Sequence, residues 1–167
     1  MRRLLLARLF AYLLALLLAG LAQAAAAAEL RPFTAASLPA IGAQFAGRPF
    51  VLVLWSLDCH YCAAELRTLG RLRRADRQLA MAIVSTDTPA QADEIRAALE
   101  QHGLGAEDTW VFADAVPERL RRAIDPVWRG ELPRSYLFDA AHRAEAHSGR
   151  LDEARLRAWL DGRARAR

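Results

Sequence analysis

The length, charge and cysteine content of the chain set the first limits on its function. The 167 residues carry a formal net charge of +4 and contain only two cysteines, Cys59 and Cys62. Three of the 23 basic residues lie in residues 1–28, so the remaining 139 residues hold 20 basic against 19 acidic side chains. A nearly neutral segment of this size can build one hydrophobic core but not two, and its charge gives no indication of nucleic-acid binding.

The first 28 residues have the features of a secretory signal peptide. A basic start is followed by an apolar run to Leu21 and by an alanine tract that ends at Ala28 and offers small-residue cleavage sites. An uncleaved membrane anchor is the alternative, because residues 9–28 carry no charge and match the ~20 residues that span a bilayer. In both cases we expect residues 29–167 to form one exported domain in the periplasm, which contacts the membrane only through an uncleaved N-terminal segment.

Strand and helix patterns alternate through the first part of this domain. Phe50 to Ser56 is a continuous apolar run, which is typical of a strand buried on both faces of a sheet. A helical stripe follows from about Cys59, and a second apolar run lies within residues 78–86. Thr88 to Gln91 resembles a capping box, with proline at the first position of a helix that ends at Gly103. This order predicts a parallel βαβα unit with right-handed crossovers.

The remaining segments complete the predicted sheet. The lead-in over residues 29–47 is irregular, with a short strand or a helical turn at most. A loop that carries Pro133 leads directly into a late strand. The later elements are a strand at 109–113, a short helix at 116–124 capped by Asp114, the late strand to Asp139, its antiparallel partner at 143–147, and a helix that begins at Asp152.

The cysteine pair lies where a buried strand ends and a helix begins. Unpaired backbone N–H groups and the helix dipole favour a thiolate there, so we expect Cys59 to be the nucleophile and Cys62, on the buried stripe, to be the resolving thiol. A protonated His60 would stabilise the thiolate, whereas the carboxylate of Asp58 would oppose it. A zinc site is disfavoured because four suitably spaced ligands are missing. Binding of soft Cu(I) by the two thiolates is the alternative function.

The whole pattern resembles a thioredoxin-like α/β fold, with a central mixed sheet flanked by helices, and in particular the exported TlpA/ResA-like thiol-disulfide oxidoreductases. The resemblance covers most of residues 38–162. It rests on the strand ending at Trp55, on the motif Cys59-His60-Tyr61-Cys62, on Glu65 three residues later, and on the segment from Gly130 to Asp139. Asp58, Tyr61 and Arg67 depart from the residues that the family usually carries at these positions.

The resemblance implies roles for the residues around the pair. Pro133 is expected to be cis and to pack against the disulfide, while Leu132 offers backbone groups to an extended substrate segment. Val53 stands where many thioredoxins bury an aspartate, so Glu65 is expected to replace it in proton transfer; a solvent-facing position is the alternative for Glu65. The expected site has Cys59 and Cys62 as catalytic residues, Trp55, Asp58, His60, Glu65 and Pro133 as supporting residues, and Tyr61 and Leu132 as substrate contacts.

The expected function is disulfide exchange with protein thiols and disulfides, with no cofactor and no metal. We favour a reductant, for example in cytochrome c maturation, which would need a membrane electron donor in an oxidising compartment. A disulfide-forming oxidase and the Cu(I) carrier or assembly factor remain the alternatives.

Overall fold

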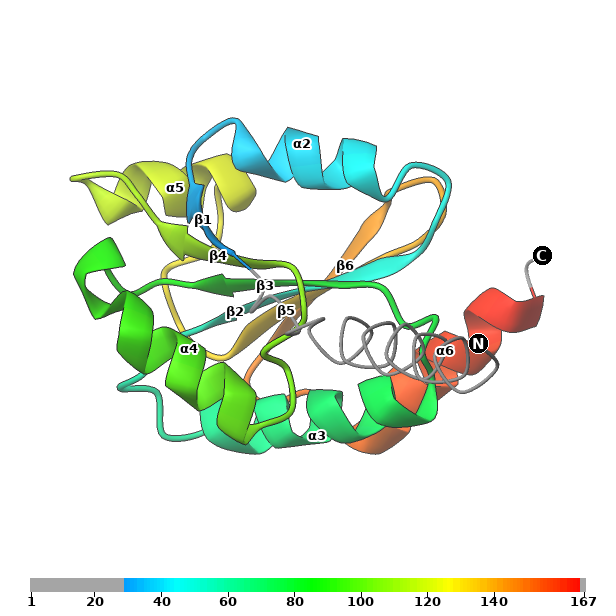
Figure 1. Ribbon diagram of the computed structural model, residues 1–167. Coiled ribbons are helices and arrows are strands. Elements are labelled where there is room, and N and C mark those ends of the chain that lie inside the picture. The colour runs from blue at the N-terminus through cyan, green and yellow to red at the C-terminus, as the bar shows by residue number, and fades with distance from the viewer. Residues whose placement is uncertain (1–28, 166–167) are drawn as a thin grey trace, which may run out of the picture.

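A mixed six-stranded sheet forms the middle of three layers in the computed structural model, which describes residues 29–165 (Figure 1). The strands are β1 Leu30–Phe33, β2 Phe50–Trp55, β3 Met81–Ser85, β4 Thr109–Phe112, β5 Arg134–Phe138 and β6 Ala144–Ser148. The helices are α2 Ser37–Gln44, α3 Cys62–Ala75, the 3-10 helix η1 Pro89–Gln91, α4 Ala92–Gln101, α5 Pro117–Ile124 and α6 Glu153–Arg165. The predicted signal peptide, residues 1–28, lies outside the described residues.

The strand order β1-β4-β3-β2-β5-β6 places β2 inside the sheet. β1, β4, β3 and β2 are parallel to one another, whereas β5 is antiparallel to both of its neighbours, β2 and β6. The predicted mixed sheet, with its parallel βαβα unit and its C-terminal hairpin, is therefore confirmed. Because the parallel strands end at one edge and β5 begins there, the loops at that edge converge on a single region.

Alternate side chains of β2 supply two separate hydrophobic cores. Val51, Val53 and Trp55 pack with α3, α4 and α6 on one face of the sheet. Leu52 and Leu54 pack with α2 and α5 on the opposite face, and Figure 1 shows the two helix layers above and below the sheet. All six residues of β2 are buried, as expected for the apolar run.

Two boundaries differ from those expected. The lead-in forms both a strand, β1, and a full helix, α2, because Phe33 and Ile41 complete the second core. The helix expected from about Cys59 begins only at Cys62, so Cys59 lies in the preceding turn. None of the helices within residues 29–165 is both long and apolar enough to cross a membrane.

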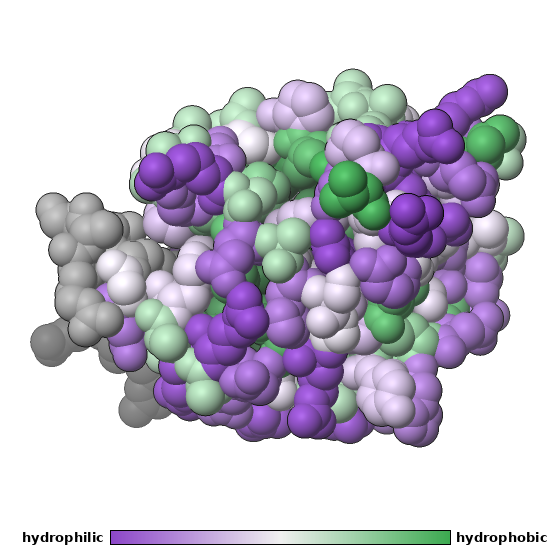
Figure 2. Space-filling view, turned by 180° about the vertical axis from the view of Figure 1, so that it is seen from behind, coloured by the Kyte–Doolittle hydropathy of each residue, from purple (hydrophilic) through white to green (hydrophobic). Residues whose placement is uncertain are grey.

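The exterior seen from behind is largely hydrophilic, and hydrophobic residues appear there as separate spots between charged ones (Figure 2). β6 contributes mostly exposed residues to the sheet edge. Charged side chains such as Glu145, which pairs with Arg155 of α6, lie on this strand. Charges on an edge strand disfavour pairing with a second sheet.

Candidate active site

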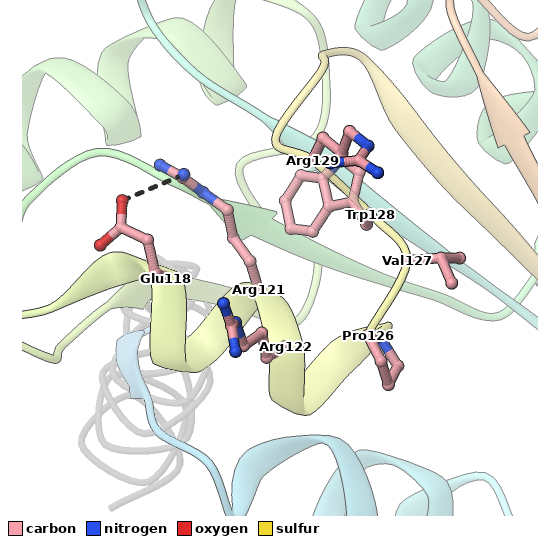
Figure 3. Close-up of a pocket in the computed structure, with 7 residues that line it drawn as sticks. All are labelled: Glu118, Arg121, Arg122, Pro126, Val127, Trp128 and Arg129. Atoms are coloured by element: carbon pink, nitrogen blue, oxygen red, sulfur yellow. Dashed lines mark hydrogen bonds and ion pairs between the residues drawn. The ribbon is translucent and has the colours of Figure 1, made fainter.

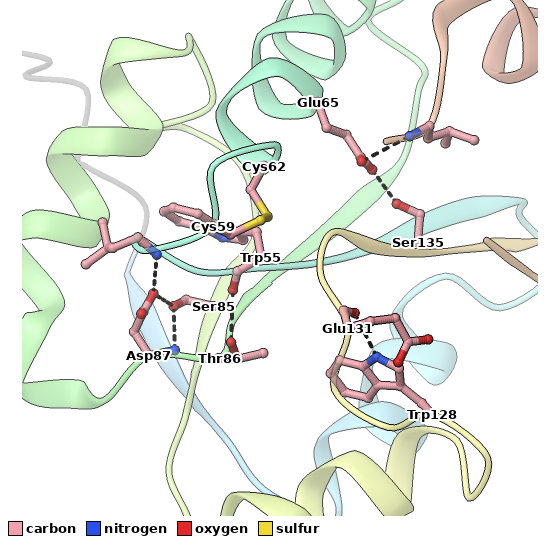
Figure 4. Close-up of a disulfide and its surroundings, with 12 residues drawn as sticks. Trp55, Cys59, Cys62, Glu65, Ser85, Thr86, Asp87, Trp128, Glu131 and Ser135 are labelled. Atoms are coloured by element: carbon pink, nitrogen blue, oxygen red, sulfur yellow. Dashed lines mark hydrogen bonds between the residues drawn. A yellow bond between two sulfur atoms is a disulfide. The ribbon is translucent and has the colours of Figure 1, made fainter. Parts of the chain in front are cut away.

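A disulfide between Cys59 and Cys62 lies beyond the end of β2, where the parallel strands finish (Figure 4). The two Cα atoms are 5.3 Å apart. Cys62 is only 1% exposed and belongs to the core on the α3 side, whereas Cys59 is half-buried. The pair thus presents one reachable sulfur and one protected sulfur.

The turn that carries Cys59 is held by backbone hydrogen bonds. The Cys59 N–H donates to the Ser56 carbonyl at 3.3 Å, and the Cys62 N–H donates to the Cys59 carbonyl at 3.1 Å. Because α3 begins at Cys62 and Glu65 still belongs to its first turn, the backbone N–H groups that lack a partner within this helix lie close to the disulfide. The local sequence therefore places both sulfurs at the N-terminal end of α3, with Cys59 just ahead of it.

Asp87 fixes the segment between β2 and Cys59, a role that the sequence reasoning missed. Its Oδ2 accepts hydrogen bonds from the Leu57 N–H at 3.0 Å and from the Ser85 hydroxyl at 2.6 Å. Thr86 adds a 2.8 Å bond from its N–H to the Trp55 carbonyl, and Figure 4 shows these groups together beside the disulfide. The available signal was a run of polar residues directly after the buried strand β3.

Trp55, a predicted supporting residue, is buried at the end of β2. Its indole lies next to the disulfide in Figure 4, and its Nε1 has no hydrogen-bond partner among the residues that the structure describes. A buried donor without a partner is uncommon in folded proteins. The orphaned indole N–H therefore distinguishes this position from an ordinary core tryptophan.

Glu65 is buried on α3, which excludes the solvent-facing alternative. Its side chain accepts hydrogen bonds from the Ser135 hydroxyl and, at 3.1 Å, from the Leu151 N–H. Burial raises the pKa of Glu65 above its usual value, although both hydrogen bonds and the charges of His147 and Arg150 act in the opposite direction. Glu65 is thus a carboxyl group that holds its proton more tightly than an exposed glutamate.

The sheet places Glu65 beside the position of Val53. Ser135, which binds Glu65, is directly paired with Val53 across β2 and β5, and both residues are buried in the sheet. Val53 itself packs in the same core as Cys62. A carboxyl group from α3 therefore reaches β5 at the register position of Val53, where β2 offers only an apolar side chain.

The peptide bond between Leu132 and Pro133 is cis, which confirms the predicted isomer. Arg134, the next residue, pairs with Leu54 of β2, so Pro133 lies at the sheet edge that carries the disulfide. Pro133 is buried, and Leu132 packs against both hydrophobic cores.

A buried polar network anchors the segment 125–134, which contains the cis proline. The Arg134 Nη2 donates to the Asp125 Oδ2 at 2.8 Å, its Nε donates to the Tyr136 hydroxyl at 3.1 Å, and that hydroxyl donates to Asp125 at 3.0 Å. Burial raises the pKa of Tyr136 to about 12. Burial alone would also raise the pKa of Asp125, but the Val127 N–H, Tyr136 and Arg134 together lower it.

Glu131 and Trp128 extend this network towards the disulfide edge (Figure 4). The Trp128 Nε1 donates to the Glu131 carbonyl at 2.9 Å, and the Ser148 hydroxyl donates to the Glu131 Oε1 at 2.7 Å. Arg134 lies 3.5 Å from the same carboxylate. Sequence reasoning did not single out this network, because its members take part through contacts that only the folded chain creates.

The other predicted residues of the motif surround the half-buried sulfur. Asp58, His60 and Tyr61 are exposed, and the His60 and Tyr61 rings meet edge to face at 5.2 Å between centroids. Their expected influence on the Cys59 thiolate and on substrate binding stays a prediction. Within the described part of the chain, no three His, Cys, Asp or Glu side chains gather in a way that could hold a metal ion.

Solved structures with a similar fold come from several bacteria. A secreted Mycobacterium tuberculosis disulfide oxidoreductase, described as homologous to Escherichia coli DsbE, is 16% identical with a TM-score of 0.57 over 72% of this chain and 86% of its own. A thiol:disulfide interchange protein of the thioredoxin family from Chlorobium tepidum is 16% identical, with a TM-score of 0.59 and coverages of 72% and 83%. A thioredoxin-related protein from Neisseria meningitidis is 18% identical, with a TM-score of 0.56 and coverages of 70% and 85%.

Neither the protein-family models nor the curated protein sequences gave a match to this chain. At such low identities, similarity to solved structures establishes the fold alone. The chain therefore has a thioredoxin-like fold, as its sequence predicted.

Proposed function

We propose that this chain is an exported thiol-disulfide oxidoreductase of the TlpA/ResA-like type that exchanges disulfides with partner proteins through Cys59 and Cys62. The observation that carries the proposal is the disulfide just beyond the end of β2, which joins the half-buried Cys59 to the buried Cys62, with the buried carboxyl group of Glu65 three residues further along α3. The names of the structural neighbours, a disulfide oxidoreductase and a thiol:disulfide interchange protein, support the same chemistry.

In the first step the Cys59 thiolate attacks a sulfur of the partner's disulfide. A bond forms between Cys59 and that sulfur, and the partner's second sulfur leaves as a thiolate. Cys59 suits this role because it is the more accessible of the two cysteines and lies just ahead of the N-terminus of α3. His60 would stabilise the attacking thiolate when protonated, and Asp58 would oppose it.

In the second step Cys62 releases the partner. Its thiol must lose a proton before it attacks the Cys59 sulfur, reforms the internal disulfide and expels the partner's thiolate. Glu65, one helical turn further along α3, would accept that proton. A carboxyl group with a raised pKa is better matched to a thiol than an exposed one is, because proton transfer is most efficient between groups of similar pKa.

Substrate binding is assigned to the edge beside the disulfide. Leu132, directly before the cis proline, would offer backbone groups to an extended segment of the partner, as in recognition by strand addition. Tyr61, whose side chain is 65% exposed, would contact the same segment. Pro133 and Trp55 would support the disulfide from either side of this groove.

The proposed direction is reduction, for example of apocytochromes during cytochrome c maturation, with electrons supplied by a membrane protein. This direction follows from Glu65 and from the resemblance to the TlpA/ResA-like family. An oxidase differs by its reduction potential, which equilibration with glutathione measures. A potential well below that of the glutathione pool supports the reductant, and a much higher one supports the oxidase.

A trapping experiment tests the proposed roles of the two cysteines. The Cys62→Ala variant, expressed with its own N-terminal segment, should accumulate mixed disulfides through Cys59, because the resolving thiol is missing. Non-reducing gels and mass spectrometry of the captured species measure this. The Cys59→Ala variant is the control and should capture nothing.

Equal capture by both variants would contradict the assigned roles. The Cu(I) alternative is tested on the reduced protein by copper titration alongside an insulin-reduction assay. Tight binding of one copper ion by a protein that fails to reduce insulin would replace the oxidoreductase with a copper carrier.

A further inference from the structure

A basic pocket of about 480 Å³ lies between α5 and the segment that follows it (Figure 3). Figure 3 shows the residues that line it, Glu118, Arg121 and Arg122 on α5 and Pro126 to Arg129 on the segment after it. Trp128 is buried and forms a wall whose indole is fixed by its bond to the Glu131 carbonyl. The pocket therefore has a rigid aromatic side and a rim of arginines.

The charges of the pocket are only partly neutralised. Arg121 pairs with Glu118 at 3.2 Å. Arg122 and Arg129 are exposed, and no carboxylate in the described part of the chain forms an ion pair with either of them. Three arginines and one glutamate leave two positive charges at the rim of a single pocket.

The pocket forms because α5 and the segment that follows it approach each other closely at Gly130. Gly130 has a φ of 98°, and a Cβ added there would lie 3.3 Å from the Arg121 guanidinium. A side chain at this position would be strained at this φ, and the Arg121 guanidinium would have to shift to make room for it. The glycine thus lets the segment after α5 pass directly beside Arg121.

The segment that lines the pocket continues along the chain to the cis proline at the disulfide edge. Residues 126–129 lead through Gly130 and Glu131 into Leu132 and the cis proline. The large hydrophobic side chains that the described residues expose are Tyr61, Val116 and Val127, and all three belong to loops at this edge. Val127, 79% exposed, also lines the pocket. A polypeptide on Leu132 could therefore extend over Val127 into the basic pocket.

We propose that this pocket binds an acidic segment of the partner polypeptide while the partner's disulfide reacts with Cys59. The inference rests on the proposed function and adds a substrate class to it. Asp58 is exposed directly beside Cys59, so negative charge next to the partner's cysteine is disfavoured. The acidic residues must lie several positions away from that cysteine, where Arg122 and Arg129 face them.

The test compares two synthetic peptides with the same internal disulfide. One carries a tail of four glutamates, separated from the nearer cysteine by several neutral residues, and the other carries four glutamines in their place. The reduced full-length protein gives two electrons to each peptide, so that the Cys59–Cys62 disulfide forms and the peptide becomes a dithiol. The second-order rate constant is followed by the change in tryptophan fluorescence at low and high salt.

We expect the acidic peptide to react about tenfold faster at low salt, because complementary charges raise association rates by 10-fold or more. The advantage should shrink in 1 M salt, where the screening length falls to about 3 Å. The double variant Arg122→Glu with Arg129→Glu should lose the preference, and its rate with neutral hydroxyethyl disulfide should stay unchanged.

The matched control is Arg48→Glu. Arg48 is an exposed arginine two residues before β2, at the opposite end of that strand from the disulfide. This variant should keep most of the preference for the acidic peptide. The inference would be overturned if Arg48→Glu reduced the preference for the acidic peptide as much, for each charge reversed, as the pocket variant does. The net charge of the protein would then be sufficient to explain the preference.

Two further outcomes distinguish failure of the pocket inference from failure of the proposed oxidoreductase function. If the protein reduces hydroxyethyl disulfide and the glutamine peptide but shows no preference for glutamate, the pocket inference fails and the oxidoreductase stands. If it reduces no disulfide at all, both fail together.

Discussion

Each face of the sheet holds one hydrogen-bonded carboxyl group, buried at Glu65 and half-buried at Asp125, and the two groups have opposite surroundings. Glu65, on the α3 side, accepts hydrogen bonds from the neutral Ser135 hydroxyl and the Leu151 N–H, and its pKa is raised by burial. Asp125, on the α5 side, faces the guanidinium of Arg134, and its pKa is lowered. Burial outweighs the hydrogen bonds and nearby charges at Glu65, whereas at Asp125 the Val127 N–H, Tyr136 and Arg134 together outweigh burial.

This contrast separates a carboxyl group suited to proton transfer from one suited to structure. Asp125 stays ionised and fixes the segment that carries the cis proline. Glu65 holds its proton more tightly than an exposed glutamate does, and its exchange of a proton with Cys62 belongs to the proposed function.

Replacing Arg134, which supplies the cation at the Asp125 site, should have the largest effect on the stability of the protein. In Arg134→Met, the carboxylate of Asp125 and the Tyr136 hydroxyl lose a partner that is only 10% exposed. Breaking such a buried pair costs about 3–5 kcal/mol. Urea unfolding of the native and variant proteins measures the difference in free energy.

The matched control is Arg157→Met, which breaks an exposed pair with Glu153 on α6. Surface pairs of this spacing contribute roughly 0.3–0.5 kcal/mol. A loss as small in Arg134→Met as in Arg157→Met would show that the network around Asp125 does not stabilise the fold.

Neutralising Glu65 should slow one chemical step and leave the other intact. In Glu65→Gln the resolving attack by Cys62 should be slower by about 100-fold, a typical contribution of a general base. The first attack by Cys59 should be little changed. Rapid mixing with a peptide disulfide, followed by acid quenching, measures the lifetime of the mixed disulfide. An unaltered lifetime would remove Glu65 from the mechanism.

The same variant should also gain stability relative to the native protein as the pH rises above about 4.5. The folded protein binds the Glu65 proton more tightly than the unfolded chain, in which the pKa of an exposed glutamate is about 4.5. Native stability is therefore lost as the pH rises through the raised pKa, and Glu65→Gln escapes this loss. Unfolding free energies should differ by a constant amount below pH 4.5 and diverge above it. Parallel curves would contradict the raised pKa.

The smallest effect is expected at His147, which pairs with Ser135 across β5 and β6. Its positive charge lowers the pKa of Glu65, so His147→Gln should raise that pKa further. NMR titration of the Glu65 carboxyl carbon measures the shift directly. A downward shift would mean that the charge of His147 does not act on Glu65.

Local sequence was sufficient for the elements with strong periodic patterns. The apolar run at β2, the capping box before α4 and the proline ahead of β5 each predicted its element to within a few residues. The capping box is present as expected, with both Thr88 and Gln91 taking part. The start of α3 was misplaced by three residues, because the turn around Cys59 continues the helical spacing of the apolar residues. Helix α2 was missed because its short, small-residue sequence is stabilised by tertiary packing of Ile41.

The site was predictable where motif and position coincide, as at Cys59, Cys62 and the cis proline. The groups that hold these residues were not predictable, because they join distant parts of the chain. Asp87 acts on Leu57, 30 residues earlier, and Leu151 donates to a carboxyl group 86 residues before it. No spacing rule within one helix or strand reports such contacts.

The position of Glu65 on the same helix as Cys62 has a mechanical consequence. The two residues are three positions apart in α3, so their separation is preserved when the helix shifts as a rigid body. Ser135 belongs to β5, two residues after the cis proline, and moves with the sheet. A displacement of β5 relative to α3 would therefore stretch the hydrogen bond between Ser135 and Glu65. The distance between the Cys62 thiol and the Glu65 carboxyl group would stay the same. Since that bond lowers the pKa of Glu65, the strain would make the carboxylate a stronger base at the moment a partner presses on the edge.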